Sequence, residues 1–146
     1  MGYQGMAGQY KRMNIETAGR VDLILMCYEK SIEMLRHAKL CLEGKEYEKK
    51  AAKMQKAIEI IHHLKGCLNF EQGGQIARNL DAIYSYAVRR LLEGDVKKDL
   101  AAFDEVIRIL SELKEAWDGV ARSEAKETAT LGGEARRSTN LQQIAA

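Results

Sequence analysis

The sequence predicts an all-α protein: an antiparallel four-helix bundle with a short N-terminal arm or helix and a disordered C-terminal tail. Three observations lead to this prediction. Four long segments carry apolar residues at spacings of three and four, which is the period of an amphipathic helix. The chain contains no proline, and an aromatic content of 6% disfavours an all-β fold rich in turns. The connections between the segments are short, which places consecutive helices antiparallel.

The chain has 146 residues, a length that suits one domain with one substantial core. Its content of 46% hydrophobic and 30% charged residues is typical of a globular protein. We expect an N-terminal arm over residues 1–16, the bundle over residues 17–121 and a disordered tail over residues 122–146.

Different sequence features predict the N-terminal arm and the first bundle helix. The arm, "MGYQGMAGQYKRMNIE", contains three glycines and no sustained period, so its order should depend on docking. The first bundle helix should begin near Thr17 or Gly19. It should end at Glu43, where Gly44 supplies the stop.

The other three helices are bounded in the same way. The second should run from about Glu46 to about Leu68, where "NFEQGG" breaks the pattern. The third should end at Glu93, because Gly94 and Asp95 turn the chain into a fourth helix. The fourth should end near Val120, since the polar segment that follows has no apolar stripe.

Helical spacing assigns a core face to each segment. The predicted core residues, in chain order, are Val21, Ile24, Leu25, Tyr28, Ile32, Leu35 and Leu42; Tyr47, Ala51, Met54, Ile58, Ile61 and Leu68; Ile76, Leu80, Ile83, Tyr84, Ala87 and Leu91; and Phe103, Val106, Ile107, Leu110, Leu113 and Trp117.

The first two helices carry more apolar residues than one core face needs. Part of this surplus lies roughly opposite the core face of the first helix, and a similar ridge follows the second. Contiguous exposed patches usually mark binding surfaces, although single exposed apolar residues are common and the arm could cover some of these. From this surplus we predict the partner-binding residues Leu23, Met26, Met34, Ile60 and Leu64, and we add Tyr86 and Leu92, which lie outside the core stripe of the third helix.

The sequence predicts that the protein is not an enzyme and binds no cofactor and no metal. Glu59 and His62 have the E-x-x-H spacing of di-metal bundles, but such sites need a second copy and two further carboxylates. No serine or cysteine has a local sequence argument for an adjacent base. Gly73 and Gly74 lack the strand and lysine of a phosphate loop.

The composition also limits partners and location. A net charge of +2 is too small to imply nucleic acid, and the apolar run at residues 23–28 is too short for membrane insertion. Three cysteines without metal-type spacing are typical of reduced thiols in a cytoplasm.

Several segments, taken together, resemble the FliS family of flagellin export chaperones. These are "YQGMAGQY" at 3–10, "ETAGRVDLILMCYEKSIEML" at 16–35, "KAIEIIHHLKGCLNFEQGG" at 56–74, "NLDAIYSYAVRRLLEGDVKKD" at 79–99 and "EVIRILSELKEAW" at 105–117. The resemblance covers about residues 3–118 in order and spacing. The chain departs from the family pattern at Gly19 and Arg20, where the family has Ser and Pro, and at Cys27, where leucine is common.

The resemblance implies an antiparallel bundle in the cytoplasm that binds the C-terminal segment of flagellin. It implies that this chaperone prevents premature polymerisation, delivers flagellin to the export gate of the flagellar type III apparatus, and touches other flagellar regulators. It also implies a partner-binding role for Tyr10 in the N-terminal arm. The alternative is a helical adaptor or regulatory module that binds another amphipathic segment, and a metal-dependent four-helix enzyme is a third hypothesis.

Overall fold

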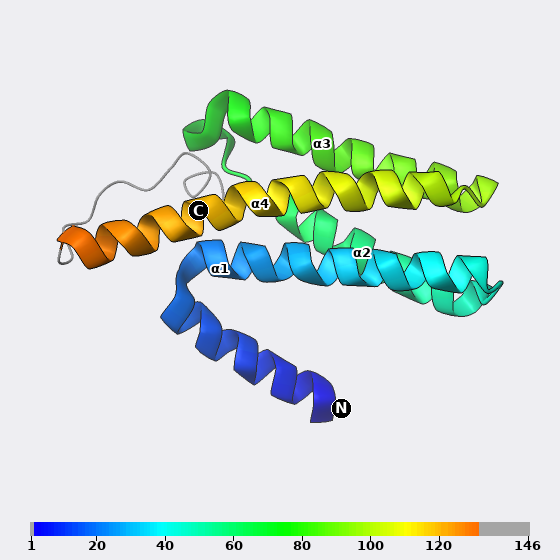
Figure 1. Cartoon of the computed structure of the whole chain (residues 1–146), viewed down its shortest axis with the longest axis horizontal. Coiled ribbons are helices and arrows are strands. Elements are labelled where there is room, and N and C mark those ends of the chain that lie inside the picture. Colours follow the sequence, from blue (N-terminus) through cyan, green and yellow to red (C-terminus); the bar gives the residue numbers. More distant parts are fainter. Residues whose placement is uncertain (1, 132–146) are drawn as a thin grey trace.

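A computed structural model describes the backbone of residues 2–131 and the side chains of residues 19–123 and 126. Its helices are α1 (Gly2–Glu43), α2 (Tyr47–Gly66), α3 (Phe70–Lys97) and α4 (Leu100–Leu131), which run alternately up and down (Figure 1). The α1 helix packs against α2 and α4, and α3 packs against α4, whereas α2 and α3 contact each other less. The predicted all-α four-helix bundle is confirmed.

The first helix is divided by a sharp bend at Gly19, where φ is 83° and ψ is −179°. Glycine adopts a positive φ without the steric cost that a Cβ brings. The part of α1 before the bend leaves the bundle, and its N-terminal end lies apart from the other helices (Figure 1). The part after the bend enters the core at Val21, which is 3% exposed.

The core between the helices contains most of the predicted stripe residues, but three of them are exposed, and a fourth, Ile83, is half-buried outside the core cluster. Tyr47 and Ile76 are 42% and 36% exposed, and Ala51 is exposed as well. Tyr47 and Ala51 lie in the first turns of α2, and Ile76 follows a second bend, at Gly74 of α3. Helix ends and bends have fewer neighbours, so the apolar period alone overstates burial there.

Two buried tyrosines link α1 to α3 through the core. The hydroxyl oxygens of Tyr28 and Tyr84 lie 2.5 Å apart, and both side chains are at most 2% exposed. Burial raises the pKa of Tyr28 to about 12 and raises that of Tyr84 still further above its ordinary value. Both groups are therefore neutral hydrogen-bonding partners at physiological pH.

The turn between α3 and α4 differs from the prediction that Gly94 ends the third helix. The α3 helix continues to Lys97, and Lys98 takes the left-handed cap conformation, with φ of 54°. Gly94 is buried within the helix, and a Cβ at this position would overlap the Cβ of Ala102 on α4. This glycine is therefore required for close packing of the two helices rather than for a turn.

Replacing Gly94 with alanine is expected to lower the free energy of unfolding by about 1–3 kcal/mol, the usual cost of overpacking a core. Helix propensity alone predicts the opposite sign, because alanine is favoured over glycine by about 1 kcal/mol. Urea denaturation measures the difference. The double variant Gly94→Ala with Ala102→Gly should recover part of the loss, and a single variant more stable than the parent would contradict the packing role.

The last helix is longer than predicted. The α4 helix continues through Leu131 and extends past the ends of the other helices (Figure 1), whereas the sequence predicted a tail from residue 122. Residues 122–131, "RSEAKETATL", contain good helix formers and neither glycine nor proline. A missing apolar stripe removes a reason for burial but does not prevent helix formation. The remainder of the predicted tail, residues 132–146, lies outside the described residues.

Candidate functional site

A groove of about 360 Å³ lies between α2 and α3, the neighbouring helices that contact each other least. Its accessible lining is mostly carbon. Two lining residues come from α2 and five from α3: His62, Lys65, Ser85, Val88, Arg89, Leu92 and Glu93. Its volume is within the range of ligand sites, and its open shape suits an elongated partner better than a small molecule.

The sequence of α3 explains why this wall is apolar. Tyr84, Ala87 and Leu91 form the buried row of the helix, and the residues that follow them by one position form a second row. That second row contains Val88 and Leu92, and the Leu92 side chain is 48% exposed. The α3 helix therefore presents one apolar row to the core and another to the groove.

Ionic contacts join α2 to α3 on either side of this row. Lys65 Nζ lies 3.5 Å from Asp81 Oδ1 toward one end, and the buried Lys50 contacts Asp95 at the other. Near that second end, Lys98 Nζ lies 4.8 Å from the centre of the Tyr47 ring. These contacts tie the helices together near their ends and leave the surface around Val88 and Leu92 accessible.

The predicted partner-binding residues do not form one surface. Leu92 lies on the groove, whereas Met34 and Leu64 are each 5% exposed and belong to the core, so their prediction as accessible residues was wrong. Leu23, Met26 and Ile60 are half-buried, and Ile60 packs against the core. Tyr10 belongs to the helical part before Gly19, where side chains lie outside the described residues.

The burial of Met34 has a geometric reason. Lys39 marks the side of α1 that faces α4, because its Nζ lies 2.9 Å from Asp104 Oδ1. Met34 precedes it by five residues, which turns the side chain by about 140° around the helix. Since α1 also packs against α2, it buries a wide arc of its surface. The apolar surplus that suggested a binding ridge is in part a second helix–helix interface.

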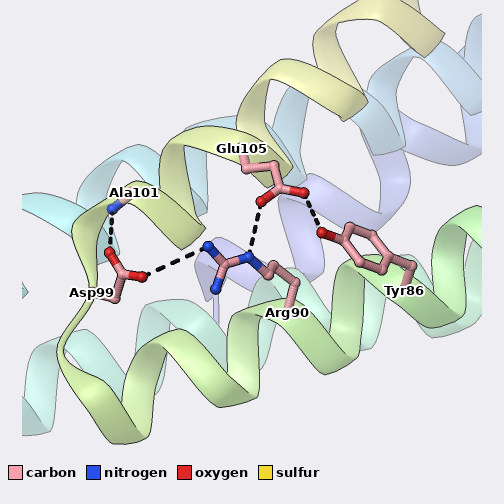
Figure 2. Close-up of polar contacts among 5 residues, drawn as sticks. All are labelled: Tyr86, Arg90, Asp99, Ala101 and Glu105. Carbon is pink, nitrogen blue, oxygen red and sulfur yellow. Dashed lines mark hydrogen bonds and ion pairs between the residues drawn. The ribbon is translucent and has the colours of Figure 1, made fainter.

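Tyr86 lies on the other flank of α3, beside α4. Its hydroxyl donates a hydrogen bond to Glu105, which also accepts from Arg90 Nε at 2.8 Å (Figure 2). Arg90 extends the cluster to Asp99, at 3.6 Å, and Asp99 accepts from the backbone N–H of Ala101 at the start of α4. Tyr86 and Leu92, which were both predicted to bind the partner, therefore face different sides of α3.

The electrostatics of this cluster follow from its hydrogen bonds. The hydrogen bond from Tyr86, and then that from Arg90, lowers the pKa of Glu105 below its ordinary value. The same bond to Glu105 raises the pKa of Tyr86. An ionised carboxylate thus holds the Tyr86 ring in place, and the guanidinium of Arg89 lies 5.5 Å from the centre of that ring.

His62 and Lys65 are groove residues that sequence reasoning missed. Each lies one position beyond a buried residue of α2, Ile61 and Leu64 respectively. Polar residues in such positions resemble the ordinary solvent-exposed side of a helix, so the sequence contains no signal that distinguishes them. Arg89 of α3 also lines the groove.

The described residues were also compared with the requirements of a membrane-spanning helix and of a metal site. Within residues 2–131, none of the helices combines the length and the apolar character needed to cross a bilayer. The side chains described in this range contain no group of three or more His, Cys, Asp and Glu residues placed to hold a metal ion. The Glu59 side chain accepts a hydrogen bond from Gln55, and His62 faces the groove.

Comparison with known proteins identifies relatives along most of the chain. A family model for the flagellar protein FliS matches residues 3–124. The flagellar secretion chaperone FliSB of Pseudomonas aeruginosa is 35% identical over 117 residues, which cover 77% of this chain and 93% of the relative. The flagellar secretion chaperone FliS of Salmonella typhimurium is 36% identical over 117 residues, which cover 77% and 87%.

A third relative matches a longer part of the chain. The flagellar secretion chaperone FliS of Bacillus subtilis is 29% identical over 133 residues, covering 91% of this chain and 98% of the relative. The residues matched by the family model include α2, α3, nearly all of α1, most of α4 and the groove between α2 and α3. The chain therefore belongs to the FliS family of flagellar proteins, whose named relatives are flagellar secretion chaperones.

Proposed function

We propose that this chain is a cytoplasmic chaperone that binds the C-terminal segment of flagellin, prevents its premature polymerisation and delivers it to the flagellar type III export apparatus. Membership of the family supports the general role in flagellar secretion. The observation that carries the binding proposal is the apolar row of α3 that remains accessible in the groove, above all the 48% exposed Leu92.

The groove suits an amphipathic helix. Val88 and Leu92 are four residues apart on α3, so a partner helix lying along the groove would meet them with one apolar stripe. Burying a large apolar side chain contributes roughly 1.5–3 kcal/mol, and several such contacts offset the cost of ordering a flexible segment. We propose that the bound segment gains helical structure as it docks.

The N-terminal part of α1 is the second element of this proposal. The bend at Gly19 separates it from the bundle, and a positive φ there lets the two parts take different directions. We propose that this part, with Tyr10, contributes to the bound state. Binding and release would then involve a change at the glycine rather than in the bundle.

Mixing the purified chain with a peptide from the C-terminal segment of its own organism's flagellin should produce heat of binding and a gain in helicity. Titration calorimetry and far-UV circular dichroism measure the two effects. Leu92→Asp should weaken binding about tenfold or more, because it places a carboxylate against the apolar stripe of the peptide.

Leu40→Asp is the matched control, since Leu40 is 65% exposed and lies on α1, outside the groove lining. It should bind the peptide as the parent does. Absence of heat and of helical gain at micromolar concentrations would contradict the proposed function. An equal loss in the two variants would move the binding surface away from the groove.

A further inference from the structure

Arg89 has an unusual position in the groove between α2 and α3. Its guanidinium lies over the ring of Tyr86 on one side and lines the groove on the other. The hydrogen bond from Tyr86 to Glu105 of α4 fixes the ring, so the arginine rests on a support that belongs to the folded bundle. A cation over an aromatic face is held in place while its hydrogen-bond donors remain free for another partner.

No carboxylate within the described residues forms an ion pair with Arg89. Its neighbour Arg90 pairs with Glu105 at 2.8 Å and with Asp99 at 3.6 Å, and Lys65 pairs with Asp81. Glu93, one turn further along α3, lines the same groove but forms no ion pair with Arg89. Arg89 is thus a positioned cation whose fork of donors matches a carboxylate that the bundle does not supply.

The charges around the groove indicate the kind of partner. The charged lining residues are the cations Lys65 and Arg89 and the single acid Glu93, and Lys65 already pairs with Asp81. A docked helix would remove water from Arg89, and an arginine that loses water without gaining an anion weakens binding. A docked helix with an acidic side chain beside its apolar stripe would cover the apolar row of α3 and would pair with the guanidinium of Arg89.

We infer that Arg89 is a specificity-determining residue of this groove, which selects an amphipathic helix with an aspartate or glutamate next to its apolar stripe. Tyr86 is the positioning residue that holds Arg89 in place. This inference rests on the proposed function, because the docked helix is taken to be the C-terminal segment of flagellin. The role of Tyr86 differs from the direct contact that the sequence predicted.

Exchanging the charges of Arg89 and of its acidic partner tests whether Arg89 selects an acidic helix. Arg89→Glu should weaken binding of the flagellin peptide about tenfold or more in titration calorimetry. In a set of peptides, each has one acidic residue changed to lysine. One of these peptides should bind the Arg89→Glu variant nearly as tightly as the parent chain binds the original peptide. That same peptide should bind the parent chain weakly.

Arg122→Glu is the matched control, since it makes the same change in net charge at an exposed position on α4. It should bind the original peptide like the parent. If Arg89→Glu also binds like the parent, or if none of the lysine peptides restores binding, Arg89 does not select an acid and the inference fails while the proposed function stands. If the parent binds no peptide, the proposed function itself fails, and the inference fails with it.

Variants of Tyr86 test whether this residue positions Arg89 or contacts the peptide itself. Tyr86→Phe keeps the ring under Arg89 but loses the hydrogen bond to Glu105, so it should weaken binding less than Tyr86→Leu. Tyr86→Leu removes the ring and should weaken binding several-fold with an unchanged melting temperature. In the Arg89→Glu background, Tyr86→Leu should have no further effect, because the two residues act through one interaction. Independent effects would assign Tyr86 a contact of its own and overturn its positioning role.

A second copy of this chain is the competing occupant of the groove. Size-exclusion chromatography distinguishes it, because Arg89→Glu would then change the oligomeric state. Self-association that Arg89→Glu abolishes, together with unchanged peptide binding, would overturn the inference.

Discussion

Replacing Leu64 with aspartate is expected to abolish cooperative folding. Leu64 is 5% exposed and belongs to the core cluster, in the helix that makes the most extensive contact with α1. The change removes roughly 1.5–3 kcal/mol of apolar burial and places a carboxylate where water cannot reach it. Breaking a core in this way costs several kcal/mol, which is comparable to the roughly 5–15 kcal/mol that stabilise a typical domain.

Thermal melting followed by circular dichroism measures this effect. The control is Ala52→Asp, which introduces the same side chain at an exposed position of the same helix and should melt close to the parent. From its sequence spacing, Leu64 was expected to lie on a partner-facing ridge, where aspartate would disturb binding and leave the fold intact. A melting temperature within a few degrees of the parent would therefore restore that earlier interpretation and contradict the packing described here.

The tyrosine pair in the core should show strong coupling. Tyr84→Phe leaves the buried hydroxyl of Tyr28 without its partner, and Tyr28→Phe does the same to Tyr84. Each single change is expected to lower the free energy of unfolding by about 1–3 kcal/mol, the cost of an unsatisfied buried polar group. The double variant should lose clearly less than the sum, since it buries no unpaired hydroxyl.

Urea denaturation of the parent, the two single variants and the double variant completes this cycle. Alkaline pH supplies a second measurement. Because the pKa of Tyr28 is raised to about 12, its stabilising contribution is complete below pH 10 and is lost as pH rises toward 12. The double variant should therefore lose less stability over this range, and additive single changes with an unaltered alkaline profile would contradict the coupling.

Much of the fold could be predicted from residue spacing alone. Tyr28, Leu35 and Leu91 were assigned to the core by their positions in a helical period, and each is fully buried. The ends of the helices were less predictable, because glycine has more than one structural role. Gly94 looked like a helix stop and proved to be the point where α3 approaches Ala102, a role that depends on a residue eight positions further along the chain.

The candidate site was predictable in part. Leu92 was singled out from its place outside the core stripe of α3, and it lies exposed on the groove. Tyr86 was singled out by the same reasoning and lies beside α4, held by Glu105. The difference between them depends on which side of α3 each neighbouring helix occupies, and the spacing of apolar residues along one helix contains no information about that.

The sequence by itself determined that this protein is a bundle of four antiparallel helices, which residues share a face of each helix, and to which family it belongs. The tertiary structure decided which of those faces are covered. A helix with two close neighbours, such as α1, buries an arc wide enough to include Met34, whereas the weaker contact between α2 and α3 leaves Leu92 accessible. Periodicity is a property of one helix, but burial depends on the number and direction of its neighbours.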